Sequence, residues 1–61
     1  MSYRILERTR AEIAQECDEA AEHYDLVASG QALNGNPEAA AHFRAMAASR
    51  RRRAQELRLH S

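Results

Sequence analysis

The chain is divided by one short stretch, Asn34-Gly35-Asn36-Pro37, which is suited both to end one helix and to begin another. Gly35 can adopt the positive φ that a helix C-terminal cap requires. Asn36 has the short side-chain acceptor favoured at an N-cap, and Pro37 suits the first helical position, where a missing N–H costs nothing. The sequence therefore predicts an all-α fold, a two-helix antiparallel hairpin.

The segments on either side of this turn have helical periodicity. We expect a single helical-hairpin domain over residues 1–61, with a helix over about 3–33 capped by Ser2, a turn over 34–36 and a helix over about 37–59. Apolar residues in the first segment recur every seven positions, as in a coiled coil. These residues are Leu6, Ile13, Ala20 and Val27.

The apolar stripes of the two segments form the predicted interface. Its members are Tyr3, Leu6, Ile13, Cys17, Ala20, Tyr24, Val27, Phe43, Met46, Arg50, Ala54 and Leu57. In an antiparallel hairpin about this turn, the numbers of facing residues add to about 70. We therefore expect contacts of Phe43 and Met46 with Val27 and Tyr24, of Leu57 with Ile13, and of Ala54 with Cys17.

The chain has only 61 residues, and small folds of this size usually need a disulfide, a metal or oligomerisation. Cys17 is the single cysteine, so no internal disulfide can form, and a lone thiol is typical of a reducing cytoplasm. Tyr3 and Leu6 are predicted to extend past the end of the second helix. We therefore expect a four-helix bundle completed by dimerisation or by a larger protein partner.

Charge is divided unequally, although the net charge is zero. Residues 1–33 contain seven acids and three arginines, a net −4, whereas residues 34–61 contain six arginines and two acids, a net +4. The two arms are complementary, which favours their antiparallel pairing. No apolar run approaches the length of a membrane span, and we expect a cytoplasmic protein that does not bind membranes.

Arg50 falls on the apolar stripe, opposite Ala20, where an unpaired buried guanidinium is unfavourable. Three arrangements remain open. Its stem can lie along the seam with the charged head in water, or it can pair with Glu16, or it can pair with an acid of another chain.

The arginine run suggests a nucleic-acid hypothesis. Arginine binds phosphate in bidentate fashion, so the possible contacts are Arg44, Arg51, Arg52 and Arg53. The run spreads around a full helical turn, lacks interleaved aromatic residues and belongs to a chain of zero net charge. Balancing the acidic first helix is the competing explanation.

Neither catalysis nor metal binding is predicted. Cys17 lies on the apolar stripe without a histidine on its face, as expected of a small buried hydrophobe. The three histidines lie off the stripe and are expected at the surface, with a possible contact between His23 and Glu19. No nucleophile–base set is present, so we assign no catalytic residue, metal ligand or cofactor.

Residues 36–47, Asn-Pro-Glu-Ala-Ala-Ala-His-Phe-Arg-Ala-Met-Ala, resemble a hairpin of the ferritin-like superfamily. The resemblance implies a metal-binding half-bundle, but the carboxylate and histidine ligands of that family have no counterparts where Ser49 and residues 50–53 stand. In size and plan the chain is also similar to RNA-binding hairpins of plasmid copy control and to small type III secretion co-chaperones. The favoured hypothesis is a non-enzymatic protein–protein interaction module; a nucleic-acid-binding regulator is second and a metal-binding half-bundle is third.

Overall fold

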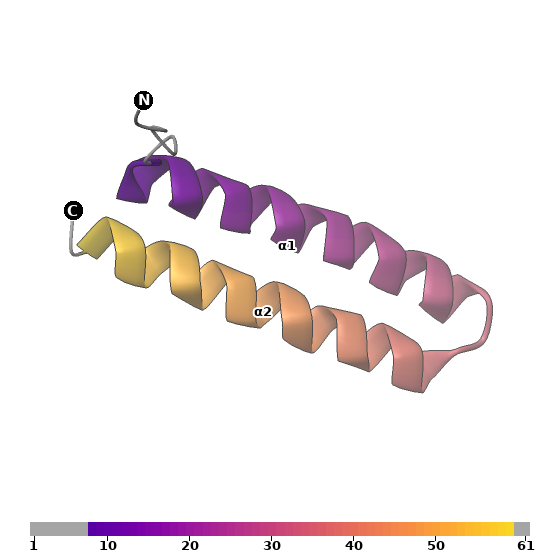
Figure 1. Ribbon diagram of the computed structural model, residues 1–61. Coiled ribbons are helices and arrows are strands. Elements are labelled where there is room, and N and C mark those ends of the chain that lie inside the picture. The colour runs from indigo at the N-terminus through magenta and orange to yellow at the C-terminus, as the bar shows by residue number, and fades with distance from the viewer. Residues whose placement is uncertain (1–7, 60–61) are drawn as a thin grey trace, which may run out of the picture.

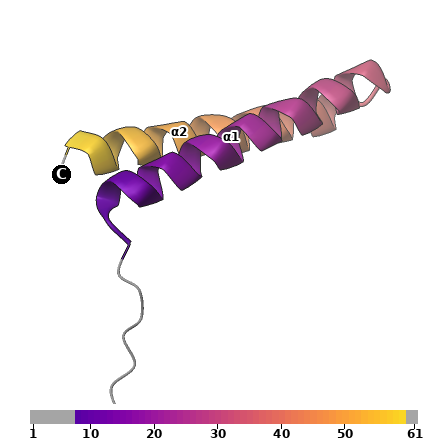
Figure 2. The ribbon, with the colours of Figure 1, turned by 90° about the horizontal axis from the view of Figure 1, so that it is seen from above.

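The computed structural model describes residues 8–59, which form two antiparallel helices joined by a tight turn (Figure 1). Helix α1 spans Arg10–Leu33 and helix α2 spans Pro37–Leu59. The two helices lie side by side along their length, so the beginning of α1 and the end of α2 are at the same end of the molecule (Figures 1 and 2). The predicted helical hairpin is confirmed, and the bounds of α2 coincide with the expected range.

Helix α1 begins later than predicted, because Thr9 acts as its N-cap. Thr9 has an extended backbone, with ψ of 161°, and its hydroxyl accepts a 3.1 Å hydrogen bond from the Glu12 N–H. The Glu12 carboxylate accepts a 3.1 Å bond from the Thr9 N–H in return. This capping box satisfies two N–H groups that would otherwise lack partners. The expected helix through residues 8 and 9 is therefore wrong, while Ser2 and Tyr3 lie outside the described residues.

The turn ends α1 and begins α2 through backbone hydrogen bonds. Gly35 has φ of +78°, a conformation that residues with a Cβ rarely adopt, and its N–H donates to the Ala32 carbonyl. The Asn36 N–H donates to the Gln31 carbonyl at 2.8 Å, and the Asn36 carbonyl accepts the first bond of α2, from Ala40. The Asn36 side-chain amide donates to the Gln31 side chain at 3.0 Å. The turn is thus tied to the last turn of α1.

The helices meet along a seam of alanines. Ala14, Ala21 and Ala28 of α1 and Ala40, Ala47 and Ala54 of α2 are fully buried, each spaced seven residues from the next on its helix. We call these six residues the alanine seam. Within the described part of the chain, Cys17 is the other buried residue, at 7% exposure. No large side chain in residues 8–59 is fully buried. On α1, each seam alanine follows a member of the predicted seven-residue repeat by one position. The members of that repeat, Ile13, Ala20 and Val27, are only half-buried.

Contacts near the open end fix the register of the hairpin. Ala54 packs with Ala14 and Cys17, and Ile13 and Leu57 pack against this cluster. The predicted contacts of Leu57 with Ile13 and of Ala54 with Cys17 are confirmed. Continuing in steps of seven residues places Ala47 at the level of Ala21, and Ala40 at the level of Ala28.

Candidate functional site: the apolar face beside the alanine seam

One broad face of the hairpin is formed by half-buried apolar side chains. Positions on a helix advance by about 100° per residue, and these side chains lie on the same side of the alanine seam on both helices. We call this surface the apolar face. It consists of Ile13, Ala20, Tyr24 and Val27 of α1 and Ala39, Phe43, Met46 and Leu57 of α2.

Aromatic rings occupy the end of the apolar face nearer the turn. Tyr24 and Phe43 stack across the two helices, with centroids 6.2 Å apart and planes inclined by 23°. The predicted contact between Tyr24 and Phe43 is thereby confirmed. The ring centroids of His42 and Phe43 are 5.6 Å apart in an edge-on arrangement, and those of His23 and Tyr24 are 6.2 Å apart. Because both central rings are only half-buried, they leave a large apolar area in contact with water.

Two arginines of α2 interrupt the apolar face. Arg50 and Arg53 are exposed, and together with Met46 and Ser49 they line a shallow hollow. Neither makes an ion pair within residues 8–59. Of the three arrangements open for Arg50, the pair with Glu16 is absent within residues 8–59, where the Glu16 carboxylate accepts bonds of 2.6 and 2.7 Å from Arg8. Arg50 lies on the stripe side as predicted and is exposed, as in the arrangement with its charged head in water.

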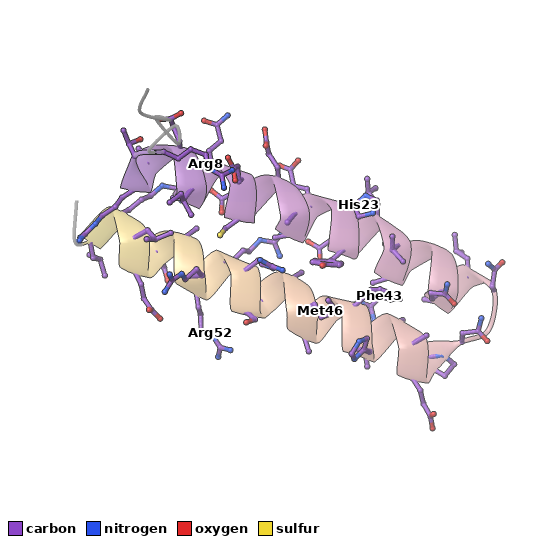
Figure 3. All side chains as sticks on the ribbon, viewed as in Figure 1. Arg8, His23, Phe43, Met46 and Arg52 are labelled. Carbon is purple, nitrogen blue, oxygen red and sulfur yellow. The ribbon has the colours of Figure 1, made fainter. Side chains whose placement is uncertain are left out.

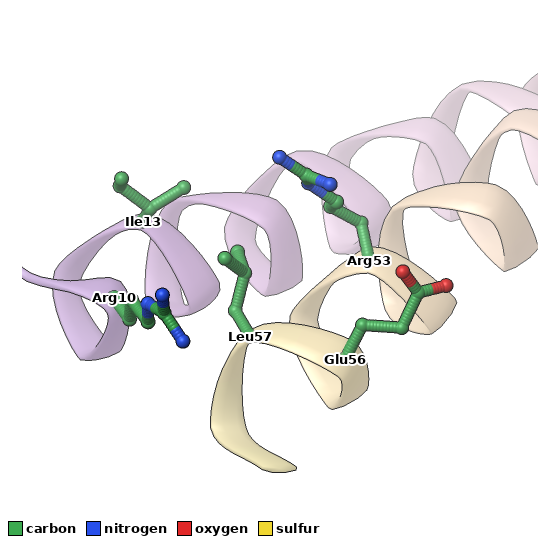
Figure 4. Close-up of a pocket in the computed structure, with 5 residues that line it drawn as sticks. All are labelled: Arg10, Ile13, Arg53, Glu56 and Leu57. Atoms are coloured by element: carbon green, nitrogen blue, oxygen red, sulfur yellow. The ribbon is translucent and has the colours of Figure 1, made fainter. Parts of the chain in front are cut away.

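A second hollow continues the apolar face toward the open end of the hairpin. Its lining includes Ile13, Leu57 and, again, Arg53, with Arg10 and Glu56 at its border (Figure 4). Arg53 therefore borders both hollows and connects the aromatic end to the Ile13–Leu57 end. The result is one continuous surface, apolar at both ends and cationic in between.

The opposite face of the hairpin is held by ion pairs between the helices. Arg51 donates to Asp25, and Arg58 lies 2.7 Å from Asp18. The hydrogen bond to Asp25 raises the pKa of the Arg51 guanidinium above its ordinary value. Since Arg51 and Arg58 are seven residues apart, as are Asp18 and Asp25, the pairs repeat along one edge. The expected role of arginine–acid pairs in orienting the helices is realised here.

The structure does not gather the predicted nucleic-acid contacts on one face. Arg51 is bonded to Asp25, Arg53 lies on the apolar face, and Arg52 points away from α1 (Figure 3). Arg44 is exposed and falls on the side of α2 where Arg51 lies. These four arginines therefore point in three different directions around α2.

The other predicted interface residues fall in two groups. Cys17 and Ala54 are buried within the hairpin, so they belong to the contact between α1 and α2. Tyr3 and Leu6 lie outside the described residues. The seam members Ala14, Ala21 and Ala28 are not among the predicted interface residues, although the sequence places them at the edge of the stripe, where small residues are expected to let a neighbouring helix come close.

The described residues offer no group of three or more potential metal ligands. His23 and His42 are exposed, and no ion pair joins His23 to Glu19 in the described part of the chain. Neither described helix has a stretch long and apolar enough to cross a membrane. Comparison with protein-family models, curated proteins and solved structures finds no match to this chain.

Proposed function

We propose that this hairpin is a non-enzymatic protein–protein interaction module that acts through its apolar face, completing a four-helix bundle with another polypeptide. The observation that carries the proposal is the distribution of side-chain size. The contact between α1 and α2 buries only alanines and a cysteine, whereas the larger side chains of the apolar face, such as Tyr24, Phe43 and Met46, remain half-exposed. A face with exposed apolar area at both ends, bordered by charged residues, is typical of an interaction site.

The energetics support the same proposal. Each buried methyl or methylene group contributes about 0.8 kcal/mol, so an alanine seam alone stabilises a hairpin weakly. A second pair of helices would cover Tyr24, Phe43, Met46 and Leu57, and fully burying side chains of this kind contributes about 1.5–3 kcal/mol each. Binding to a partner would therefore supply much of the free energy that keeps the hairpin folded.

Adjacent substitutions on α2 test this function. Met46→Glu places a charge on the apolar face, whereas Ala45→Glu places the same charge on the exposed neighbouring position. We expect Met46→Glu to abolish self-association or binding to a co-purifying partner, as measured by sedimentation of the purified chain or complex. Ala45→Glu should leave association unchanged.

Two outcomes would contradict the proposal. One is a wild-type chain that sediments as a monomer at all concentrations and purifies without a stoichiometric protein partner. The other is binding to RNA or DNA with an affinity that falls steeply with salt and is lost when Arg51, Arg52 and Arg53 are replaced by Gln. That second result would support the nucleic-acid hypothesis instead.

A further inference from the structure

The arginines on the apolar face indicate which kind of side chain a partner must bring to this surface. Arg53 lines both surface hollows, and Arg50 shares one of them, yet neither forms an ion pair within residues 8–59. A partner that covers this face removes water from around both guanidinium groups. It must therefore supply an acid at their level, because a desolvated charge without a counter-ion is strongly unfavourable.

The chain carries such an acid in the required place. Ala54 packs with Ala14 and Cys17, so Arg53 lies close to the level of Glu16 along the hairpin. Glu16 precedes Ala20 by one helical turn and stands at the outer edge of the apolar face on α1, with its side chain 47% exposed. Its carboxylate already accepts from Arg8, but two carboxylate oxygens have lone pairs for a second guanidinium.

A two-fold axis parallel to the helices brings these groups together. This axis places α2 of a second copy over α1 of the first. Rotation about it does not change a residue's position along the helix axis, so both turns lie at the same end of the bundle. Each apolar layer then meets its own equivalent: Ile13 and Leu57 at the open end, and Tyr24 and Phe43 nearer the turn. Between them, Arg53 of each copy meets Glu16 of the other, and the small Ala20 leaves room for the arginine stems.

The charges of the helices select this arrangement over the alternative axis. Helix α1 contains six acids and one arginine, and α2 contains six arginines and two acids. A two-fold axis perpendicular to the helices would lay α1 on α1 and α2 on α2, with like charges facing each other. The parallel axis instead pairs each acidic helix with a basic helix, which electrostatic complementarity favours.

We propose that the apolar face binds a second copy of this chain, with both turns at one end and with reciprocal Arg53–Glu16 pairs between the copies. This inference rests on the proposed function and specifies its partner. It assigns α1 and α2 of different copies as neighbours in the bundle, in addition to the pairing within each chain.

Two single substitutions, mixed, test the reciprocal pairs. Arg53→Glu places two acids together in a homodimer, and Glu16→Arg places two arginines together, so each should raise the dimer dissociation constant roughly tenfold. In an equimolar mixture, both contacts between the two variants again join opposite charges. We therefore expect the mixture to form a heterodimer as stable as the wild-type dimer, measured by native mass spectrometry and sedimentation. Arg52→Glu is the matched control, since Arg52 points away from α1, and it should not weaken the dimer (Figure 3).

Failure of this inference can be separated from failure of the proposed function. Helicity by circular dichroism first confirms that each variant is folded. A wild-type dimer whose weakened variants do not recover on mixing overturns the reciprocal pairs but leaves the interaction function standing. A monomer that binds a different protein through Met46 overturns self-association alone, and a monomer with no partner overturns both.

A distance measurement tests the direction of the axis independently. Spin labels on Asn34→Cys, in a Cys17→Ala background, should lie close together when both turns share one end. An α1 helix of 24 residues is about 36 Å long, so labels separated by roughly that distance or more would show turns at opposite ends and overturn the proposed arrangement.

Discussion

Single residues of the alanine seam set how closely the two helices approach. Ala14, Ala21 and Ala28 are fully buried against α2, and only a small side chain fits where two backbones come this near. The seam therefore restricts residue size more strictly than hydrophobicity. Enlarging one of its members forces the helices apart along their length.

The prediction at this scale compares neighbouring alanines of α2. Ala47 is fully buried and Ala48 is exposed, and leucine has nearly the helix propensity of alanine. We expect Ala47→Leu to lower the free energy of unfolding by about 1–3 kcal/mol through overpacking, and Ala48→Leu to change it by less than about 0.5 kcal/mol. Urea unfolding at one fixed protein concentration measures both. Equal effects at the two sites would contradict the seam.

A second residue-scale prediction concerns Glu12 and pH. Hydrogen bonds with Thr9 hold the pKa of the Glu12 carboxyl below its ordinary value of 4.5. The lowered pKa stabilises the folded helix above pH 4.5, and this contribution is lost as the pH falls through the folded-state pKa. We expect the protection of the Thr9 amide, that is, its exchange rate compared with the intrinsic rate at the same pH, to fall across that range. Glu12→Gln, which has no carboxyl to titrate, should show no such step.

The sequence supports some of these residue-scale features better than others. The Tyr24–Phe43 and Ile13–Leu57 contacts follow from helical periodicity and an antiparallel register. The seam itself does not, because a hydrophobicity pattern gives greater weight to Ile13 and Val27 than to the alanines beside them. Only the requirement for close approach shows why the small residues are at the centre.

At the scale of helices, the termini are set by local chemistry that is readable in the sequence. The turn was predicted because Gly35 and Pro37 have strong conformational preferences. The start of α1 was placed too early because helical periodicity continues upstream of Thr9. The Thr9-Arg-Ala-Glu12 capping box was the competing signal, and it determines where the helix begins.

The two glycines provide a matched prediction for the helices. Gly30 lies inside α1 with nothing within 4 Å of an added Cβ, whereas Gly35 has positive φ. Gly30→Ala should therefore raise the free energy of unfolding by about 0.5–1 kcal/mol, because alanine favours the helix. Gly35→Ala should lower it by about 1–2 kcal/mol, because a Cβ is strained in the left-handed region. Thermal unfolding of both variants measures the difference, and shifts of the same sign would show that this turn does not depend on Gly35.

At the scale of the whole molecule, the two broad faces differ in character. One bears aromatic and aliphatic side chains with Arg50 and Arg53 among them, and the other bears the ion pairs of Arg51 and Arg58. The sequence predicted an uncovered apolar end at Tyr3 and Leu6, with the two stripes packed against each other, whereas the structure leaves the apolar face half-exposed along both helices. The sequence did not predict how the charges divide between the faces, which depends on the rotation of each helix about the seam.

The proposed self-association predicts a melting temperature that depends on protein concentration. If a second copy covers the apolar face, the melting temperature should rise with protein concentration, because mass action favours the folded dimer. Circular dichroism melts from micromolar to millimolar protein measure this rise. A melting temperature that does not change over that range would contradict the dimer.

The pairs of Asp18 with Arg58 and Asp25 with Arg51 also have a consequence for assembly size. These ion pairs balance the charges on the face opposite the apolar face, and that face is in contact with water. If two hairpins join through their apolar faces, a third hairpin that stacks on the outside must first remove water from these paired charges. The ion pairs therefore disfavour stacking into long fibres, although Leu26, Leu33 and Leu59 are exposed outside the apolar face.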